Sequence, residues 1–230
     1  MTHLAATILF AALTVGAFEA AGLLSRRIGH PALNPTLLAI LALIAVLGGF
    51  GVSYPAYMRG GAPIAWLLGP ATVALGVTLA RNMGAILRDG PAILVALIAG
   101  AVTAAISGPL VLSLLGGSGA LAQAMAPKAA TTPIAMAVAR EIGGTASLAA
   151  LFAIAGGVVV AVALRPLLGW LGVDEPRAFG LAAGVAGSGI GAAEAVAHTQ
   201  EAGAYAALGV ALTAIATALI VPVLAMLHLA

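Results

Sequence analysis

The sequence predicts an all-α, polytopic membrane protein of about seven to eight helical segments, of which two or more are broken or re-entrant. Three observations support this fold class. The chain is 63% hydrophobic and only 7% charged, whereas a soluble domain carries about 25% charged residues. Several apolar stretches reach the roughly 20 residues that cross a bilayer. Prolines and glycines interrupt some of these stretches where a continuous helix would otherwise run.

The composition also excludes several classes of function. The formal net charge is +2, so the chain lacks the basic footprint of a nucleic-acid-binding protein. It has no cysteine, which excludes disulfides and thiolate metal sites. The four histidines lie at segment ends, and the acidic residues show no metal-binding spacing. We therefore expect no enzymatic activity, no metal and no cofactor.

Two unbroken segments open the chain. Residues 4–24 form the first, which lacks the basic start of a signal peptide and is taken as a retained span. Arg26 and Arg27 follow it and indicate a cytoplasmic loop. A shorter helix is expected at residues 35–50.

The third segment, residues 63–83, is the first that we expect to be broken. Gly69 and Pro70 fall at mid-membrane depth, where a proline removes a helix hydrogen bond. Residues 91–115 then form a continuous span, which the glycine-rich residues 116–119 close.

The central stretch, residues 126–144, concentrates features that the rest of the sequence avoids. It contains two prolines, Pro127 and Pro133, and we expect Pro133 to break a helix running through it. In hydrocarbon, the freed backbone groups need protein or a wet cavity beside them. This stretch is therefore predicted to be a broken helix that lines a binding site.

The last third of the chain holds another interrupted segment between two spans. Residues 145–171 form one span and residues 204–229 the other. Between them, Gly187 and Gly189 each lower helix stability by about 1 kcal/mol relative to alanine. Close packing between helices is the alternative explanation for these glycines.

An internal repeat is expected within a single membrane domain, residues 1–230. A shift of 59 residues aligns Thr72 with Thr131 and Arg81 with Arg140. The repeat units would cover about residues 63–116 and 120–172, although an alanine-rich sequence also produces chance matches. Paired interrupted segments in two halves are typical of secondary transporters.

The candidate site residues cluster at the predicted breaks. A broken helix offers free N–H groups and a positive dipole end, which favour a small anion. We expect substrate binding by Lys128, Thr131, Thr132, Thr72 and Ser188. A gating role or ion pairing is expected for Arg81, Arg140, Glu141 and Glu194. For Lys128 the alternative is a cation that reaches to the membrane interface, and for Arg140 and Glu141 it is a structural pair at a helix end.

Two motifs also resemble those of a known family. The run from Lys128 to Met136, followed by Glu141 to Gly144, is similar to the signature of the LrgB/CidB family. Leu68 to Leu75 and Gly184 to Gly191 resemble two further blocks of that family. The resemblance extends from about residue 37 to residue 222. The family usually has a histidine where this chain has Ser188.

The resemblance implies two kinds of function. Bacterial LrgB proteins are antiholin-like modulators of murein hydrolase activity and lysis, whereas the C-terminal half of the plastid translocator carries glycolate and glycerate. Other bacterial members are linked to pyruvate uptake. We favour a secondary transporter of small monocarboxylates; the alternatives are a holin- or antiholin-like regulator of lysis and a scaffold for a partner.

The expected partners follow from these possible functions. They are a small organic anion, an LrgA- or CidA-like small membrane protein, the lipid bilayer and further copies of the chain. The expected location is the bacterial cytoplasmic (inner) membrane.

Overall fold

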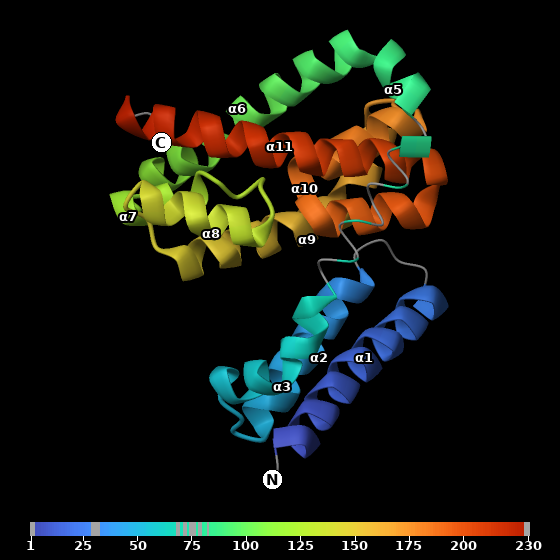
Figure 1. The fold of residues 1–230 in the computed structure, drawn as a ribbon, viewed down its shortest axis with the longest axis vertical. Coiled ribbons are helices and arrows are strands. Elements are labelled where there is room, and N and C mark those ends of the chain that lie inside the picture. Colours follow the sequence, from blue (N-terminus) through green and yellow to red (C-terminus); the bar gives the residue numbers. More distant parts are fainter. Residues whose placement is uncertain are drawn as a thin grey trace. The chain divides into compact units, whose positions relative to one another are not determined.

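The computed structural model describes residues 3–28, 33–67, 70, 73, 77, 80–81 and 83–227. Within these residues the regular secondary structure is entirely helical (Figure 1). The helices are α1 (His3–Ile28), α2 (Pro35–Gly49), α3 (Tyr54–Trp66), α5 (Met83–Arg88), α6 (Gly90–Leu114), α7 (Gly119–Met125), α8 (Thr132–Glu141), α9 (Ala146–Trp170), α10 (Pro176–His198) and α11 (Gln200–Met226). Their contacts divide the chain into two compact units, residues 1–74 and 75–230.

Local sequence sets several of the helix ends. The Asn34 side chain caps α2 by accepting hydrogen bonds from the N–H groups of Thr36 and Leu37, at 2.9 and 3.4 Å. The Thr199 hydroxyl caps α11 in the same way, at 3.0 Å from the N–H of Ala202. After α6, Gly116 adopts a φ of 79°, which favours glycine and ends the helix.

The first unit packs α1 against α2 and α3. The Phe10 and Tyr57 rings meet edge to face, with centroids 5.7 Å apart. The Tyr57 hydroxyl also lies 2.7 Å from the Thr14 hydroxyl. A side chain at Gly60 would collide with Phe10, so this glycine allows α3 to approach α1 closely.

The start of α3 corrects one prediction. The third segment was expected to begin at Pro63, but α3 begins at Tyr54 and contains Pro63. A proline in a helix interior leaves one carbonyl without its partner. The sequence rule that places proline at a helix start therefore gave the wrong boundary here.

In the second unit, α6 and α11 run in the same direction. Ile93 and Tyr205, near their N-terminal ends, share one buried cluster, and Ala105 and Val221 share another. Helix α9 runs in the direction opposite to α6 and α11. Its C-terminal part lies at the end of the unit where α11 begins. There the Arg165 guanidinium hydrogen-bonds the His198 ring at 2.8 Å.

The second unit therefore has two ends of different chemistry. One, named here the charged end, carries most of the charged residues of α6, α9, α10 and α11; these are Asp89, Arg165, Glu175, Arg177, His198 and Glu201. The other, named the opposite end, contains the C-termini of α6 and α11 and the N-terminus of α9.

Helix α10 is not straight but folds back on itself at Ser188. The Phe179 and His198 rings lie 5.3 Å apart, although nineteen residues of straight helix would separate them by about 28 Å. Ser188 has φ 50° and ψ −138°, outside the helical region. The two halves also touch along their length, since a Cβ at Gly191 would lie 2.1 Å from the Ala183 carbonyl oxygen. We call this element the α10 hairpin, with its tip at residues 187–189.

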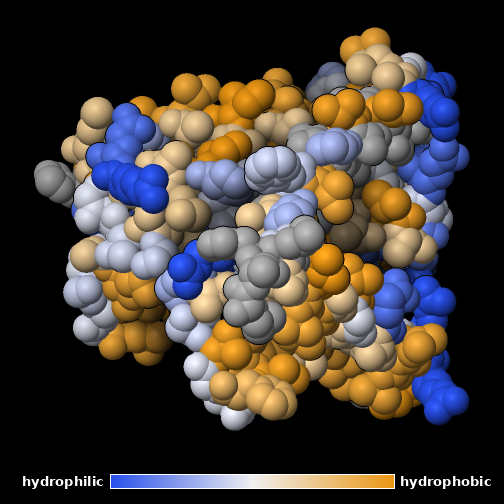
Figure 2. Space-filling view, turned by 60° about the horizontal axis from the view of Figure 1, so that its bottom comes forward, coloured by the Kyte–Doolittle hydropathy of each residue, from blue (hydrophilic) through white to orange (hydrophobic). Residues whose placement is uncertain are grey.

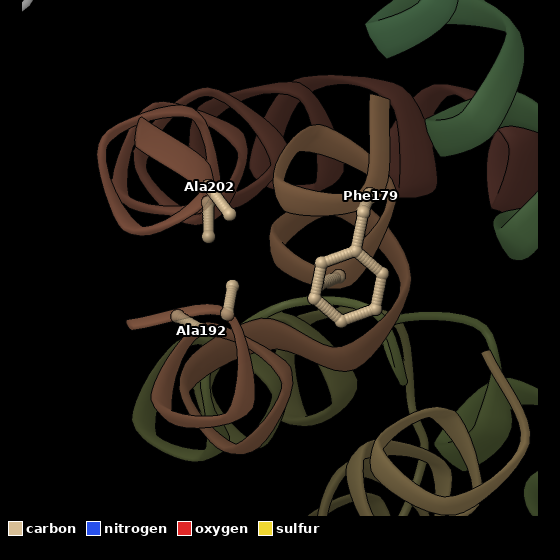
Figure 3. Close-up of a cluster of buried hydrophobic side chains, with 6 residues drawn as sticks. Phe179, Ala192 and Ala202 are labelled. Carbon is tan, nitrogen blue, oxygen red and sulfur yellow. The ribbon is translucent and has the colours of Figure 1, made fainter. Parts of the chain in front are cut away.

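Small residues hold the α10 hairpin against α11. A Cβ added at Gly180 or Gly184 would lie 2.1 or 2.2 Å from the carbonyl oxygens of Ala202 and Ala206. Both helices thus present small residues four positions apart, the spacing that brings membrane helices close together. In Figure 3, Ala192 and Ala202 point toward one another and the Phe179 ring lies beside them.

The membrane prediction is confirmed by the helix inventory and by the surface. Five of the described helices, α1, α6, α9, α10 and α11, are long and apolar enough to cross a bilayer. Large apolar side chains are exposed along them, including Leu94, Ile98, Val159, Ile215 and Leu219. Hydrophobic residues cover broad areas of the face in Figure 2, which suits lipid and not water. The chain is an integral membrane protein.

The described helices exceed the seven to eight predicted segments, in part because the interruption at residues 126–131 leaves α7 and α8 as short separate helices. A re-entrant course through the bilayer and the internal repeat both stay predictions. The first repeat unit lies partly outside the described residues.

Candidate functional site

The first component of the site is the interruption between α7 and α8. Residues 126–131 are non-helical, and Ala126, Pro127 and Ala130 in this stretch are buried. We expected Pro133 to break a helix; the interruption is present, but it lies just before Pro133, which occupies the first turn of α8. A first-turn N–H has no partner within the helix, so proline fits there without loss.

Lys128 extends from this interruption to the middle of α6. Its ammonium donates a hydrogen bond to the Ala104 carbonyl oxygen, and the side chain is half-buried. Gly108 makes room for it, because a Cβ there would lie 2.8 Å from the Lys128 Nζ. Ala104 lies about 15 Å along α6 from its C-terminal residue, Leu114. An ammonium carries three N–H donors, so the bond to Ala104 leaves donors for a further acceptor.

The second component is the tip of the α10 hairpin. Ser188 is 7% exposed and lies between the two glycines predicted as a break. A Cβ at Gly187 would lie 2.7 Å from Val160, so the tip packs against the middle of α9. Nearby, a Cβ at Gly100 of α6 would lie 2.8 Å from the Val185 side chain. Gly100 is about 15 Å along α6 from its N-terminal residue.

These two components both contact the middle of α6. The hairpin comes from the charged end and contacts α6 at Gly100, whereas Lys128 comes from the opposite end and contacts it at Ala104. Four residues of helix separate these contacts, a rise of about 6 Å. The structure thus brings Lys128 and Ser188, two of the predicted site residues, to neighbouring levels of one helix.

Helix α11 adds two buried hydroxyls that sequence analysis missed. Thr213 is 0% exposed and Thr217 is 4% exposed. Within the described residues, the Thr213 hydroxyl is a buried side-chain oxygen without a hydrogen-bond partner. It follows Gly209, which contacts the hairpin, and precedes Val221, which packs with Ala126 of the α7–α8 interruption. In the sequence, the pair of threonines one turn apart within an apolar span could have indicated these two buried hydroxyls.

The remaining predicted residues lie elsewhere or outside the described structure. Thr131 and Thr132 are half-buried at the start of α8. Arg140 and Glu141 are exposed at the end of α8, and Glu194 is half-buried in the second half of α10. Thr72 and Gly69 lie outside the described residues, and Pro70 and Arg81 are exposed.

A network around Arg177 joins three elements at the charged end. The Arg177 Nε lies 2.7 Å from Glu201 and 3.7 Å from Glu175, and its Nη1 lies 3.3 Å from Asp89. The Tyr205 hydroxyl donates to Asp89 at 2.5 Å. The hydrogen bond from Tyr205 lowers the pKa of the Asp89 carboxyl below its ordinary value, and the positive charge of Arg177 lowers it further. Asp89 is therefore ionised at neutral pH.

The described residues contain no group of three histidine or acidic side chains that could hold a metal ion. The arrangement can instead bind a small anion: it offers an ammonium, hydroxyls and non-helical backbone near the middle of membrane-length helices.

These features define a polytopic helical membrane protein in which two interrupted elements both reach the middle of one long helix. Residues 14–227 match the LrgB-like family, and the chain belongs to that family. The "Holin-like protein CidB" of Staphylococcus aureus (strain Mu50) is 31% identical over 220 residues, which cover 96% of each chain. That of Staphylococcus epidermidis (strain ATCC 12228) is 30% identical with the same coverage. YxaC of Bacillus subtilis (strain 168) is 33% identical over 209 residues, which cover 90% of each chain. No solved structure matches this chain.

Proposed function

We propose that this protein is a holin- or antiholin-like regulator that acts in the bacterial cytoplasmic membrane and influences cell lysis. The observation that supports this role best is the similarity, over nearly the whole length of both chains, to relatives named holin-like. The comparisons therefore favour the alternative of the sequence analysis over the transporter that it placed first.

The geometry suggests where such a protein would control passage across the membrane. Two interrupted elements reach the middle of α6 from opposite ends and contact it four residues apart. A small change in the packing of either element would open or close a path there. The protein would then regulate permeability by shifting between two packing arrangements of these elements, without a chemical reaction.

Carriage of small monocarboxylates is the second candidate, and Lys128 is the observation that favours it. A cation among membrane helices is costly and by default marks a functional site. One carboxylate matches one ammonium in charge, and the neighbouring hydroxyls can donate hydrogen bonds. A carrier would bind one anion between the two elements and release it to the other side.

Purified protein in liposomes separates the two functions. A holin-like protein should release a trapped fluorescent anion, with a rate that rises steeply with the protein-to-lipid ratio and does not saturate with solute. A carrier should instead retain the dye and take up radiolabelled glycolate, glycerate or pyruvate saturably. Empty liposomes and liposomes with an unrelated helical membrane protein are the controls.

A second measurement tests the cellular role. Expression in bacteria, with and without a small LrgA- or CidA-like membrane protein, should change the rate of lysis and the murein hydrolase activity in zymograms. Saturable uptake together with unchanged lysis would contradict the holin-like role and support the carrier.

A further inference from the structure

The second unit contains a pocket of about 730 Å³ that extends from the charged end to the contact of Val185 with Gly100, where the α10 hairpin reaches α6. It lies between α6, the first half of α10 and Tyr205 of α11. Ligand pockets measure roughly 300–1,000 Å³, so this open pocket has the volume that a ligand requires.

The walls of this pocket are apolar and built from small residues. The small side chains recur every four residues on both facing helices: Ala92, Ala96 and Gly100 on α6, and Ala178, Ala182 and Ala186 on α10. Ile93 and Leu181 add larger apolar surface. Eight residues of helix give the walls a length of about 12 Å. The lining includes Gly100 and Val185, which pack against each other.

At the charged end, the lining of the pocket changes from apolar to polar and charged. Asp89, Glu175, Arg177 and Tyr205 line this part, and Glu201 pairs with Arg177. Three carboxylates thus surround one guanidinium, whose donors are already directed to acids of the same chain. This charged part of the pocket, named here the mouth, consequently attracts a cationic group more strongly than an anion.

Arg88 lies next to Asp89 in sequence and is exposed. The mouth therefore also offers one cation outside the Arg177 network. A headgroup that carries an ammonium and a phosphate can place the ammonium among the carboxylates and the phosphate near Arg88.

We propose that the pocket binds a phospholipid with an ammonium headgroup, of the phosphatidylethanolamine type, with one acyl chain between α6 and α10. The tail lies in the apolar part of the pocket, against the small residues of α6 and α10. A primary ammonium provides three hydrogen-bond donors, which suit the carboxylates of Asp89 and Glu175 in the pocket lining. Neither phosphatidylglycerol nor phosphatidylcholine provides such donors from an ammonium. This proposal does not depend on the function proposed above.

Lipid retention tests the proposal. The full chain is purified in mild detergent, exposed to equal amounts of phosphatidylethanolamine, phosphatidylglycerol and phosphatidylcholine with identical acyl chains, washed, and analysed by native mass spectrometry. We expect preferential retention of phosphatidylethanolamine. Ala182→Leu should abolish retention because the larger side chain fills the apolar part of the pocket, whereas Ala99→Leu, an exposed position outside the pocket lining, should not.

Glu175→Gln tests the headgroup without altering the apolar part of the pocket. It should reduce the preference for phosphatidylethanolamine about two- to fivefold, the range of a partly exposed ion pair. Asp174→Asn removes the same charge one residue away, outside the pocket lining, and should have no effect.

Three results would overturn the proposal. Equal retention of the three lipids would exclude ammonium recognition, and full retention by Ala182→Leu would place the lipid elsewhere. A disulfide-linked dimer of Ala182→Cys, with no lipid retained by the wild type, would show that a second copy of the chain covers the pocket.

Discussion

Lys128 places an ammonium beside the middle of α6, and its role depends on which acceptors its donors reach. The Ala104 carbonyl takes one donor. If the others bind a carboxylate, losing the charge removes charge-assisted hydrogen bonds worth about 1.5–3 kcal/mol each. A purely structural lysine would only hold the α7–α8 interruption against α6.

The first prediction concerns this ammonium. Lys128→Met keeps the aliphatic length and should weaken the apparent affinity for a small carboxylate about tenfold to a hundredfold in liposome uptake. Arg59→Met, at an exposed cation of α3, is the control and should leave uptake unchanged. Unchanged half-saturation in Lys128→Met would exclude carboxylate binding by Lys128. Wild-type behaviour of Lys128→Arg together with that result would leave only a structural role.

A second prediction concerns the buried hydroxyl of Thr213. Because this hydroxyl has no partner among the described residues, replacing it with a methyl group of similar size removes a desolvation cost of about 1–3 kcal/mol. Thr213→Val should therefore raise the thermal unfolding temperature in detergent. Thr103→Val, at an exposed position of α6, should change it little. Destabilisation by Thr213→Val would mean that the hydroxyl has a partner in the folded protein, such as a bound water or ion.

At the scale of elements, the α10 hairpin depends on close contact with α11. A Cβ at Gly184 would lie 2.2 Å from the backbone oxygen of Ala206, and backbone cannot move aside as a flexible side chain can. Every half-helix of the hairpin is too short to be stable without such packing. The interface therefore carries much of the stability of this element.

The third prediction follows from that contact. Gly184→Ala should lower the free energy of unfolding by about 1–3 kcal/mol, as overpacking typically does. Gly169→Ala in α9 is the matched control: no atom lies within 4 Å of its added Cβ, and alanine favours the helix by up to about 1 kcal/mol. Thermal unfolding of both variants in one detergent measures the difference. Equal stability of the two variants would contradict the tight α10–α11 interface.

At the scale of the whole molecule, the distribution of arginines predicts the orientation of the second unit. Arg165 and Arg177 lie at the charged end together with Asp89, whereas Arg140 lies at the end of α8 toward the opposite end. The positive-inside rule therefore places the charged end in the cytoplasm. The folded-back α10 also implies that both ends of this helix lie on that side.

The fourth prediction tests orientation and the hairpin together. The chain has no native cysteine, so single cysteines report sidedness directly. Glu175→Cys and Gln200→Cys, which flank α10, should both react with a membrane-impermeant maleimide only from the cytoplasmic side, and Ser118→Cys only from outside. Labelling of Glu175→Cys and Gln200→Cys from opposite sides would show that α10 crosses the bilayer. Labelling of Ser118→Cys from the cytoplasmic side would reverse the orientation.

The sequence by itself determined the helical membrane class, the family and the two interruptions near Lys128 and Ser188, whereas the break predicted at Gly69 and Pro70 lies largely outside the described residues. These depend on local chemistry: the apolar composition, the motif around Lys128, and the glycines around Ser188. Local rules gave the wrong helix start at Pro63, which α3 accommodates at the loss of one helix hydrogen bond, and they did not show that the interruption before α8 ends just ahead of Pro133.

Only the tertiary structure decided where the chain goes after each interruption. The reversal at Ser188 depends on contacts between residues far apart in sequence, such as Gly184 with Ala206 and Phe179 with His198. The same holds for the bond between Lys128 and Ala104 and for the burial of Thr213. A glycine or proline permits a change of direction, but the direction itself is selected by the packing that it makes possible.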